Sequence, residues 1–394
     1  MKATKWKSYS LALIAGMSVL TACSSDDNND NGGNGNNGNG NEIENGTTLK
    51  GTITSDVTLT AGSTYKLSGE YIVEDGATLN IEAGVKIISI YDDIVDYILV
   101  KQGGKINAVG TSSAPIVMTS EKEEPGAWGG IHICGKAHTN AEGGKGSSEI
   151  GGATYGGNDD ADNSGTLKYV RVEYSGYAFD SEHEANGITF YGVGNGTTVE
   201  YCQAYKGSDD GFEFFEGSVN VSNLVSVSCS DDSFDWTEGW NGTATNLVAY
   251  QEAEETLGYD CDCLIEADNN ENNYAATPVA HPVLKNLILV GNNSAAGNRG
   301  IRLRRGTQVE IDGAKVCGKK NAVTLESEET ENALLAGTSK LANMTVDSEL
   351  RSEKNIYTND NFVSAGNTVD TSLKYTSFDD IKAECEWMAG NWVK

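Results

Sequence analysis

Six carboxylates recur in two segments of the chain that lie 22 residues apart. They are Asp209, Asp210, Glu213, Asp231, Asp232 and Asp235. If the two segments are neighbouring strands, about 4.8 Å apart, these side chains crowd one edge of a sheet, and like charges placed side by side destabilise it. Such crowding calls for a cation, raised pKa values or a polar ligand. The pattern predicts a metal or ligand site with calcium as the candidate ion. The alternative is that the Asp-Asp pairs bind turn amides while the strand acids are solvated.

A weaker candidate metal site lies upstream. Asp160 and Asp162, followed by Ser164 and Gly165, imitate the start of a calcium-binding loop. The twelfth position is Arg171 rather than a glutamate, which excludes an EF-hand. We expect at most a looser calcium-binding turn at Asp160 and Asp162.

Two arginines are candidate ligand-binding residues. Arg302 and Arg304 lie two positions apart in an alternating segment, so their guanidinium groups could bind a sugar carboxylate in a bidentate manner. The alternative is a surface on which arginines compensate neighbouring acids.

The elements that position these residues repeat along the chain. Alternating apolar segments recur at spacings of 22 to 24 residues, and larger gaps indicate inserted loops. One kind of segment begins at Ile188, Phe212, Phe234, Cys261, Ile301 and Val323. A turn of a parallel β-helix, with its short strands and turns, needs about this length. We predict an all-β fold, a single-stranded right-handed parallel β-helix.

The register follows from the alternation. The first and third residues of each such segment are expected to point inward, Cys261 and Cys263 included. The outward column is then Thr189, Glu213, Asp235, Asp262, Arg302 and Thr324. A second kind of segment begins with asparagine, which predicts a hydrogen-bonded ladder at a turn. The asparagines are Asn223, Asn246, Asn286 and Asn343.

The N-terminus predicts export and a lipid anchor. Lys2, Lys5 and Lys7 precede an apolar stretch at 9–20, so residues 1–22 are expected to be a secretory signal, too short to span a membrane. Leu20-Thr21-Ala22-Cys23 resembles the bacterial lipobox, which implies acylation of Cys23 and attachment to a membrane. Residues 23–45 contain mainly Asn, Gly and acidic residues and are expected to form a flexible tether.

The remainder is expected to contain a β-helix at 46–350 and a C-terminal coil and cap at 351–394. No helical pattern with caps is found before residue 375. Ser377-Phe378-Asp379-Asp380 predicts the start of a short helix near 377–388 that covers the final coil.

Without residues 1–22 the chain has 25 Lys and Arg against 57 Asp and Glu, a net charge of −32. This charge argues against nucleic acid as a partner.

Several phrases resemble a family of bacterial, Bacteroides-group, pectin-lyase-like β-helix surface lipoproteins. They are Trp128-Gly129-Gly130-Ile131, the run 164–174 and the two Asp-Asp strands, and the likeness extends over most of 47–394. Ser24-Ser25-Asp26-Asp27 is similar to the surface-export signal of such lipoproteins. The resemblance implies the fold and a position on the outer membrane, facing the cell exterior. It implies no activity, because none is established for the family.

Enzyme signatures are absent from the sequence. The Asn-Thr-Asp and Gly-His-Gly phrases of polygalacturonases are not found, and the four histidines form no metal-type cluster in the sequence. We therefore name no catalytic residue and expect a non-catalytic module that binds a glycan or an outer-membrane partner such as a nutrient transporter. The alternatives are a polysaccharide lyase or glycoside hydrolase acting on acidic polysaccharide, with the stacked Asp pairs as acid and base, and a structural or adhesive stalk.

Overall fold

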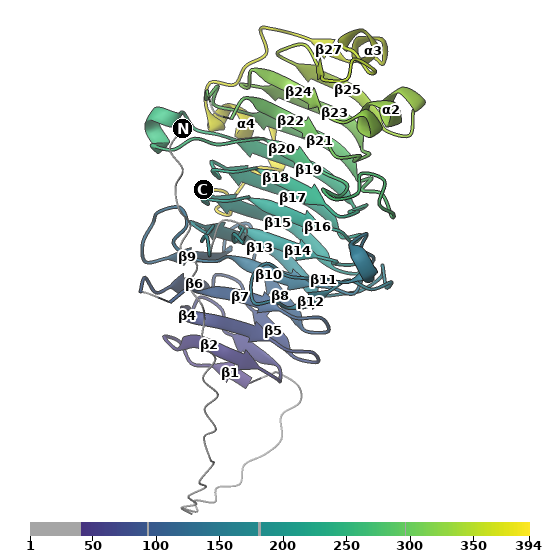
Figure 1. Ribbon diagram of the computed structural model, residues 1–394. Coiled ribbons are helices and arrows are strands. Elements are labelled where there is room, and N and C mark those ends of the chain that lie inside the picture. Colours follow the sequence, from purple (N-terminus) through teal and green to yellow (C-terminus); the bar gives the residue numbers. More distant parts are fainter. Residues whose placement is uncertain (1–40, 93, 180–182, 296) are drawn as a thin grey trace, which may run out of the picture. The chain divides into compact units, whose positions relative to one another are not determined.

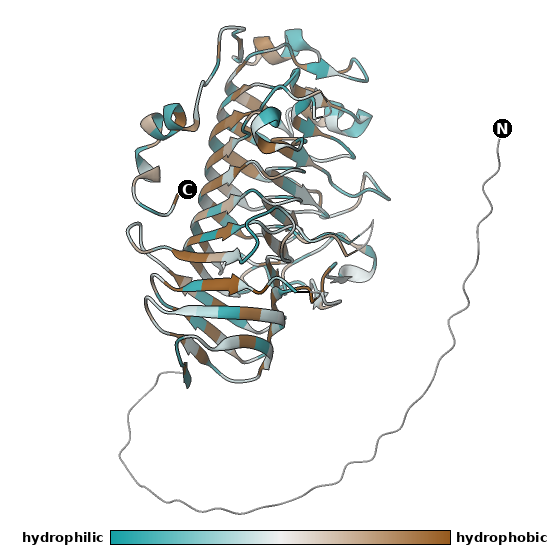
Figure 2. Cartoon of the chain, turned by 90° about the vertical axis from the view of Figure 1, so that its left-hand side faces the viewer, coloured by the Kyte–Doolittle hydropathy of each residue, from teal (hydrophilic) through white to brown (hydrophobic). Residues whose placement is uncertain are grey.

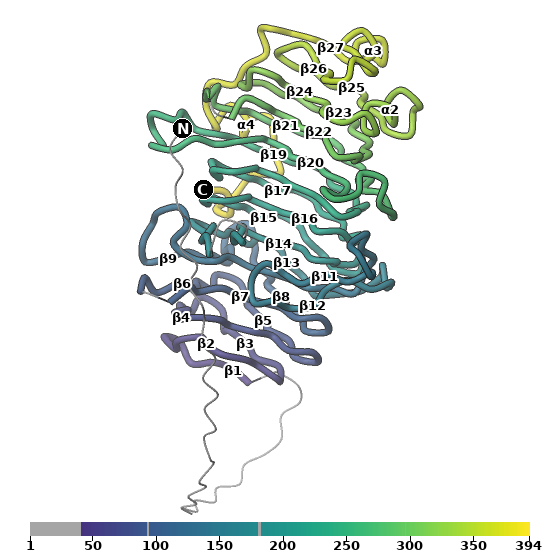
Figure 3. The backbone as a smooth tube through the Cα atoms, in the orientation of Figure 1, coloured from purple at the N-terminus to yellow at the C-terminus, as the bar shows by residue number. Residues whose placement is uncertain are grey.

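The chain winds into a stack of coils in which each coil pairs with the next. The computed structural model describes residues 41–92, 94–179, 183–295 and 297–394, and the stack begins with β1 (Asn41–Ile43) and rises toward the C-terminal coils (Figures 1 and 3). The strands of the stack pair in parallel, coil upon coil, to form three long faces. This confirms the predicted right-handed parallel β-helix. The predicted signal peptide, Cys23 and most of the tether lie outside the described residues.

Faces 1 and 2 share long strands that bend at a corner. The bent strands are β13 (Gly165–Glu173), β15 (Thr198–Tyr205), β17 (Asn220–Val227), β19 (Thr243–Tyr250), β21 (Val283–Val290), β23 (Glu310–Cys317) and β25 (Lys340–Val346). In the first coils, face 1 consists of β1, β3 (Val57–Leu59), β5 (Thr78–Ile81) and β8 (Lys105–Val109). Face 2 there consists of the start of β2 (Thr48–Ile53), the start of β4 (Thr64–Val73), β6 (Lys86–Ser89) and β9 (Ile116–Ser120), and β27 (Thr368–Val369) ends it.

The corner residues adopt left-handed backbone, which explains the repeated asparagines. Asn246 and Asn286 have φ of 61° and 59°, a conformation that asparagine tolerates better than most residues. The Asn246 amide donates to Asn223 Oδ1 at 3.4 Å, and the Asn286 amide donates to Asn246 Oδ1 at 3.3 Å. The predicted ladder is therefore confirmed for these three. The ladder is interrupted at β23, where Gly313 occupies the corner. The Asn343 side-chain amide therefore donates to Asp312 Oδ1 instead, at 2.7 Å.

Face 3 carries the candidate site. Its strands are the end of β2 (Thr48–Ile53), the end of β4, β7 (Tyr97–Val100), β10 (Ile131–Cys134), β14 (Ile188–Tyr191), β16 (Phe212–Phe215), β18 (Phe234–Thr237), β20 (Ile265–Ala267), β22 (Arg299–Leu303), β24 (Asn321–Leu325) and β26 (Arg351–Ser352). The predicted inward residues stack inside the coils. Phe190 lies 5.1 Å from Phe214 and Phe212 lies 5.5 Å from Phe234, ring centre to ring centre. Full burial of such a side chain contributes about 1.5–3 kcal/mol.

The predicted register of face 3 is wrong at one coil. Asp235 pairs with Glu266 and Trp236 with Ala267, so Ile265 and Ala267 are the inward residues of β20. Cys261 and Cys263 are buried but lie before the strand. The column is therefore Thr189, Glu213, Asp235, Glu266, Arg302 and Thr324.

Helices close the last coils, contrary to the expectation of no helix before residue 375. They are α2 (Glu328–Ala336) and α3 (Asn359–Ser364), and a single turn, α1 (Glu254–Leu257), lies earlier. Ser327 caps α2 by accepting from Thr330 N, a signal that the sequence contains. Phe362 of α3 is buried in the core, and the buried carboxylate of Glu331 accepts from the amides of Ile356 and Tyr357 at 2.7 and 3.2 Å.

The C-terminal segment covers a side of the stack rather than its end. The helix α4 (Phe378–Glu384) begins at the predicted cap Ser377, and a short turn, η2 (Glu386–Met388), follows it. The segment descends along face 2 and brings the C-terminus to the middle of the stack (Figures 1 and 2). Trp392 packs against the corner tyrosines Tyr169 and Tyr201, and the Lys394 amide donates to Gln203 Oε1 at 2.8 Å.

Two further features bear on the site and on the domain boundaries. A loop with the turn η1 (Glu142–Gly144) and the hairpin β11 (Gly146–Ser147) and β12 (Thr154–Tyr155) packs its apolar residues on the outside of face 3. The first strand, β1, begins at Asn41, inside the segment expected to be tether. Among the described residues, no helix is long and apolar enough to cross a membrane.

Candidate functional site

A polar groove lies on the outside of face 3. Its volume is about 650 Å³. The strands β16 and β18 supply its floor, the hairpin loop supplies one wall, and the loop after β20 supplies another. The lining residues are Glu149, His183, Glu213, Phe215, Asp235, Thr237, Glu238, Asp268, Asn270, Glu271, Asn272, Arg304 and Arg305. Two of the six predicted carboxylates, Glu213 and Asp235, therefore face this groove.

The six predicted carboxylates come together, and we call them the acid cluster. Oxygens of Asp210, Glu213 and Asp235 lie within 4.8 Å of one another, and so do oxygens of Asp210, Asp231 and Asp232. Asp209 and Asp231 form a third such group with Glu184, from the loop before β14. Carboxylate oxygens at this spacing could hold a divalent cation such as calcium.

The Asp-Asp pairs also bind turn amides. Asp210 Oδ1 accepts from the Asp232 amide at 2.9 Å, and Asp232 Oδ1 accepts from the Cys263 amide at 2.6 Å. Each of these two aspartates thus bonds the turn of the next coil. The same alternative also expected the strand acids to be solvated. This is wrong for Glu213, which is buried and accepts a hydrogen bond from the side-chain amide of Asn186.

The electrostatics of the acid cluster favour proton uptake. Burial raises the pKa of Asp209 to about 8, and the carboxylates of Glu184 and Asp231 add to the rise. Burial likewise raises the pKa of Glu213 and of Asp235 well above the usual range, with neighbouring carboxylates as further causes. Asp235 Oδ1 is enclosed and has no hydrogen-bond partner among the described residues.

In the adjoining coils arginines pair with the acids, although burial still raises the pKa of Glu266, and we call these residues the arginine network. Its members are Glu266, Asp268, Arg302, Arg304, Arg305 and Glu326. Arg302 bonds Glu266 at 2.5 Å and Glu326 at 2.9 Å. Arg304 bonds both Glu266 and Asp268, the latter at 2.6 Å. The predicted ligand-binding arginines thus already bind carboxylates of the protein, as the compensated-surface alternative expects.

The weaker candidate pair does not join the acid cluster. Asp160 Oδ1 accepts from the His138 amide at 3.1 Å and contacts His138 Nδ1 at 2.6 Å. Asp162 Oδ2 accepts from the Lys136 amide at 3.2 Å. Both carboxylates therefore stabilise turns, and neither belongs to a group of metal-ligating side chains among the described residues.

Several groove residues were not predicted from the sequence. Glu149, Glu238, Asp268 and Glu271 lie in loops or turns, where no strand alternation fixes their direction. Burial raises the pKa of Glu149 to about 7. A signal did exist for Glu238, because it follows the strand β18 just as Glu216 follows β16.

The stacked coils and the polar groove on one face define a parallel β-helix protein. The chain belongs to the pectate-lyase-like β-helix domain family, whose model matches residues 51–394.

One solved structure that resembles the chain is the Dettilon tailspike protein (gp208). It is 10% identical, with a TM-score of 0.35, and the match covers 76% of this chain and 56% of the tailspike chain. The chain thus spans little more than half the length of that protein. No curated protein matches the chain.

Proposed function

We propose that the chain is a non-catalytic glycan-binding module, displayed by a lipid anchor on the outer membrane, and that the groove on face 3 is its binding site. The groove itself carries this proposal. It presents carboxylates, amides and guanidinium groups to a concave surface of ligand size, and the stacked strands beneath hold these groups in fixed positions. Sugar hydroxyls both donate and accept hydrogen bonds, and this mixture of groups matches them.

The charge of the groove favours an uncharged or cationic glycan. Acidic side chains outnumber the two arginines and one histidine of its lining. They are Glu149, Glu213, Asp235, Glu238, Asp268 and Glu271. Arg304 and Arg305 are held by Asp268, so binding a uronate would require these ion pairs to break. An acidic polysaccharide therefore finds both guanidinium groups of the groove already paired with carboxylates of the protein.

Binding measurements on the mature chain test the proposal. We expect a neutral or amino-sugar oligosaccharide to bind more tightly than an oligogalacturonate in calorimetric titration. Glu271→Ala and Asn272→Ala each remove an exposed groove group and should weaken binding about fivefold, the effect of one lost hydrogen bond.

The control for these variants is Glu349→Ala, which removes an exposed acid outside the groove. It should leave affinity unchanged. A chain that binds no glycan in the panel would contradict the proposal and favour the structural stalk.

One observation favours a glycoside hydrolase as a second candidate. Glu149, with a pKa of about 7, lines the same groove as Glu213 and Asp235, and a carboxyl that keeps its proton near neutral pH can act as a general acid. New reducing ends from a polysaccharide panel, abolished by Glu149→Gln, would establish this activity. Binding without cleavage would exclude it.

The anchor is proposed from Cys23 and the acidic residues after it. If Cys23 is acylated, Cys23→Ser should release the protein from membranes or leave the precursor uncut. Asp26→Ala with Asp27→Ala should keep the lipid but reduce cleavage by external protease. Unchanged membrane fractionation of the Cys23 variant would refute the anchor, and equal protease exposure would refute surface export. An outer-membrane protein such as a transporter is the partner to seek by crosslinking if the anchor is confirmed.

We also propose calcium as a ligand of the acid cluster. The close approach of Asp210, Glu213 and Asp235 supports it, because a divalent cation offsets the repulsion among crowded carboxylates.

A further inference from the structure

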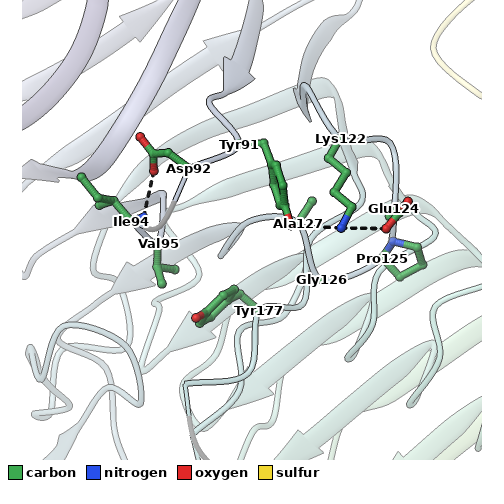
Figure 4. Close-up of a pocket in the computed structure, with 10 residues that line it drawn as sticks. All are labelled: Tyr91, Asp92, Ile94, Val95, Lys122, Glu124, Pro125, Gly126, Ala127 and Tyr177. Carbon is green, nitrogen blue, oxygen red and sulfur yellow. Dashed lines mark hydrogen bonds and ion pairs between the residues drawn. The ribbon is translucent and has the colours of Figure 1, made fainter.

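A second concave site lies at the lower coils, outside the groove on face 3. It is a pocket of about 330 Å³ between the loop after β6, the loop after β9 and the loop after β13. Figure 4 shows its lining, with Tyr91, Lys122 and Glu124 along one side and Tyr177 on the other. None of its ten lining residues lines the groove.

Exposed apolar side chains concentrate here. Among the described residues, eight large apolar side chains are exposed, and four of them line this pocket or adjoin it. They are Tyr91, Ile94, Tyr177 and Phe179, with exposed fractions of 56%, 57%, 37% and 41%. Phe179 packs edge-on against Tyr177 at 5.2 Å. Two solvent-exposed tyrosine rings at one pocket are typical of a ligand-binding surface.

The polar groups of the pocket are fixed and nearly neutral. Lys122 Nζ bonds Tyr91 Oη at 3.1 Å and Glu124 at 2.9 Å, and it lies 4.5 Å from the Tyr91 ring centre. Asp92 Oδ1 accepts from the Ile94 amide at 2.8 Å, which holds this carboxylate at the rim. The one ammonium group of the lining is therefore already paired, and the pocket offers no surplus of positive charge for an anion.

Backbone hydrogen bonds hold the floor of the pocket. The amides of Gly126 and Ala127 donate to Ser175 O and Tyr174 O at 2.8 and 3.0 Å. The Tyr177 amide donates to Trp128 O at 3.2 Å. Tyr177 is thus positioned by a framework that joins two loops, and a ligand would meet a largely preformed surface.

We propose that this pocket binds an uncharged sugar ring, which stacks on Tyr91 or Tyr177 and bonds the polar rim through its hydroxyls. The C–H face of a pyranose suits the negative face of an aromatic ring. The carboxylates of Asp92 and Glu124 accept from hydroxyls, and the tyrosine hydroxyls accept or donate. The site is separate from the groove and does not depend on the groove's being a glycan site.

Fluorine NMR of the 3-fluorotyrosine-labelled mature chain tests the inference. The probes are the methyl glycosides of glucose, galactose, mannose and N-acetylglucosamine, with cellobiose and maltose. Tyr91→Phe and Tyr177→Phe assign the two resonances. We expect at least one neutral sugar to shift both, and to leave unmoved the resonance of Tyr274, which is 40% exposed and lies outside the pocket.

Affinity variants complete the test. Tyr91→Ala and Tyr177→Ala should each weaken binding of that sugar about tenfold, whereas Tyr274→Ala should change it less than twofold. The groove variant Glu271→Ala should keep the tyrosine shifts. Two tyrosine resonances unmoved by every sugar, or binding that survives Tyr91→Ala with Tyr177→Ala, would overturn the inference. Loss of the shifts in the groove variant would also overturn it, because the two sites would then be one.

Discussion

The acid cluster and the arginine network occupy adjacent coils of face 3 and solve the same electrostatic problem differently. In the network, Arg302 lies between Glu266 and Glu326. Although burial alone would raise the pKa of Glu326, the hydrogen bond and charge of Arg302 lower it below its usual range. In the cluster, burial and neighbouring acids raise the pKa of Glu213 and Asp235. Because burial and neighbouring acids outweigh the nearby guanidinium of Arg304 at Asp235, a proton, a cation or a ligand must supply the remaining positive charge.

Removing the network's counter-charge should have the largest effect. Arg302→Ala removes two charge-assisted bonds, to Glu266 and to Glu326, and leaves these carboxylates with Arg304 and Arg299 alone. We expect a loss of about 3 kcal/mol in the free energy of unfolding, measured by urea denaturation, at about 1.5 kcal/mol or more for each bond. The matched control is Arg351→Ala, in the same column but exposed and paired with exposed Glu353, which should cost about 1 kcal/mol or less. Equal losses would show that the network is only a surface ion-pair array.

Calcium should act on the cluster and not on the network. A cation that binds only the folded chain stabilises it by about 2.7 kcal/mol at a hundred times its Kd. We expect EDTA to lower the Tm and calcium to restore it, and Asp235→Asn with Asp210→Asn to abolish this response.

The control for the calcium response is Asp160→Asn with Asp162→Asn, since those carboxylates already bond turn amides. This double variant should keep the response. A Tm indifferent to chelator would leave the cluster as architecture that binds turn amides and protons.

The pH dependence of stability should distinguish the two regions next. Asp209 has a pKa of about 8 in the folded chain against 3.8 ordinarily. Between these pH values the folded chain holds a proton that the unfolded chain has lost, so the free energy of unfolding falls as pH rises. Asp209→Asn should therefore be more stable than the parent at pH 8 and no more stable at pH 4, and the difference should widen by up to about 1.4 kcal/mol for each pH unit between them. A parallel pH profile in parent and variant would contradict the raised pKa.

Substitutions at the corner between faces 1 and 2 should have the smallest effect on the free energy of unfolding. Asn286→Ala places alanine in left-handed backbone and removes one rung of the ladder, at a cost of about 1–2 kcal/mol in thermal or urea unfolding. Asn286→Gly should cost less, since Gly313 occupies the equivalent corner one coil later. Equal costs for the two variants would assign the effect to the amide and not to the backbone.

Features that repeat from coil to coil can be predicted directly from the sequence. Period-two alternation places Phe212, Phe234 and their equivalents inside, and the 22-residue spacing stacks Asp210 on Asp232. Prediction fails where a loop is inserted. The turn α1 and its flanks separate β19 from β20, and the alternation Cys261-Asp262-Cys263 fits a strand as well as Ile265-Glu266-Ala267 does. Only pairing with neighbouring coils selects the second.

Local sequence patterns also do not predict the direction in which a capped helix packs, or which residues form the walls of a groove. Ser377 marks the start of α4 correctly. The helix lies on face 2 because an apolar stripe there, with Val248 and Ile288, accepts it, and α3 covers the last coil instead. Glu149 and Glu271 reach the groove from loops, where spacing carries no information on direction.

The difference in counter-charge between the two regions can be measured at the carboxyls themselves. Carbon NMR of the mature chain, labelled at the glutamate side-chain carboxyl, gives the titration of each residue once Glu213→Gln and Glu326→Gln have assigned the two signals. In chelator, Glu326 should titrate below the usual glutamate range and Glu213 well above it. Added calcium, if it binds the cluster, should move the Glu213 titration downward and leave Glu326 unchanged. Titration of both carboxyls near the ordinary value of 4.5 would contradict the account.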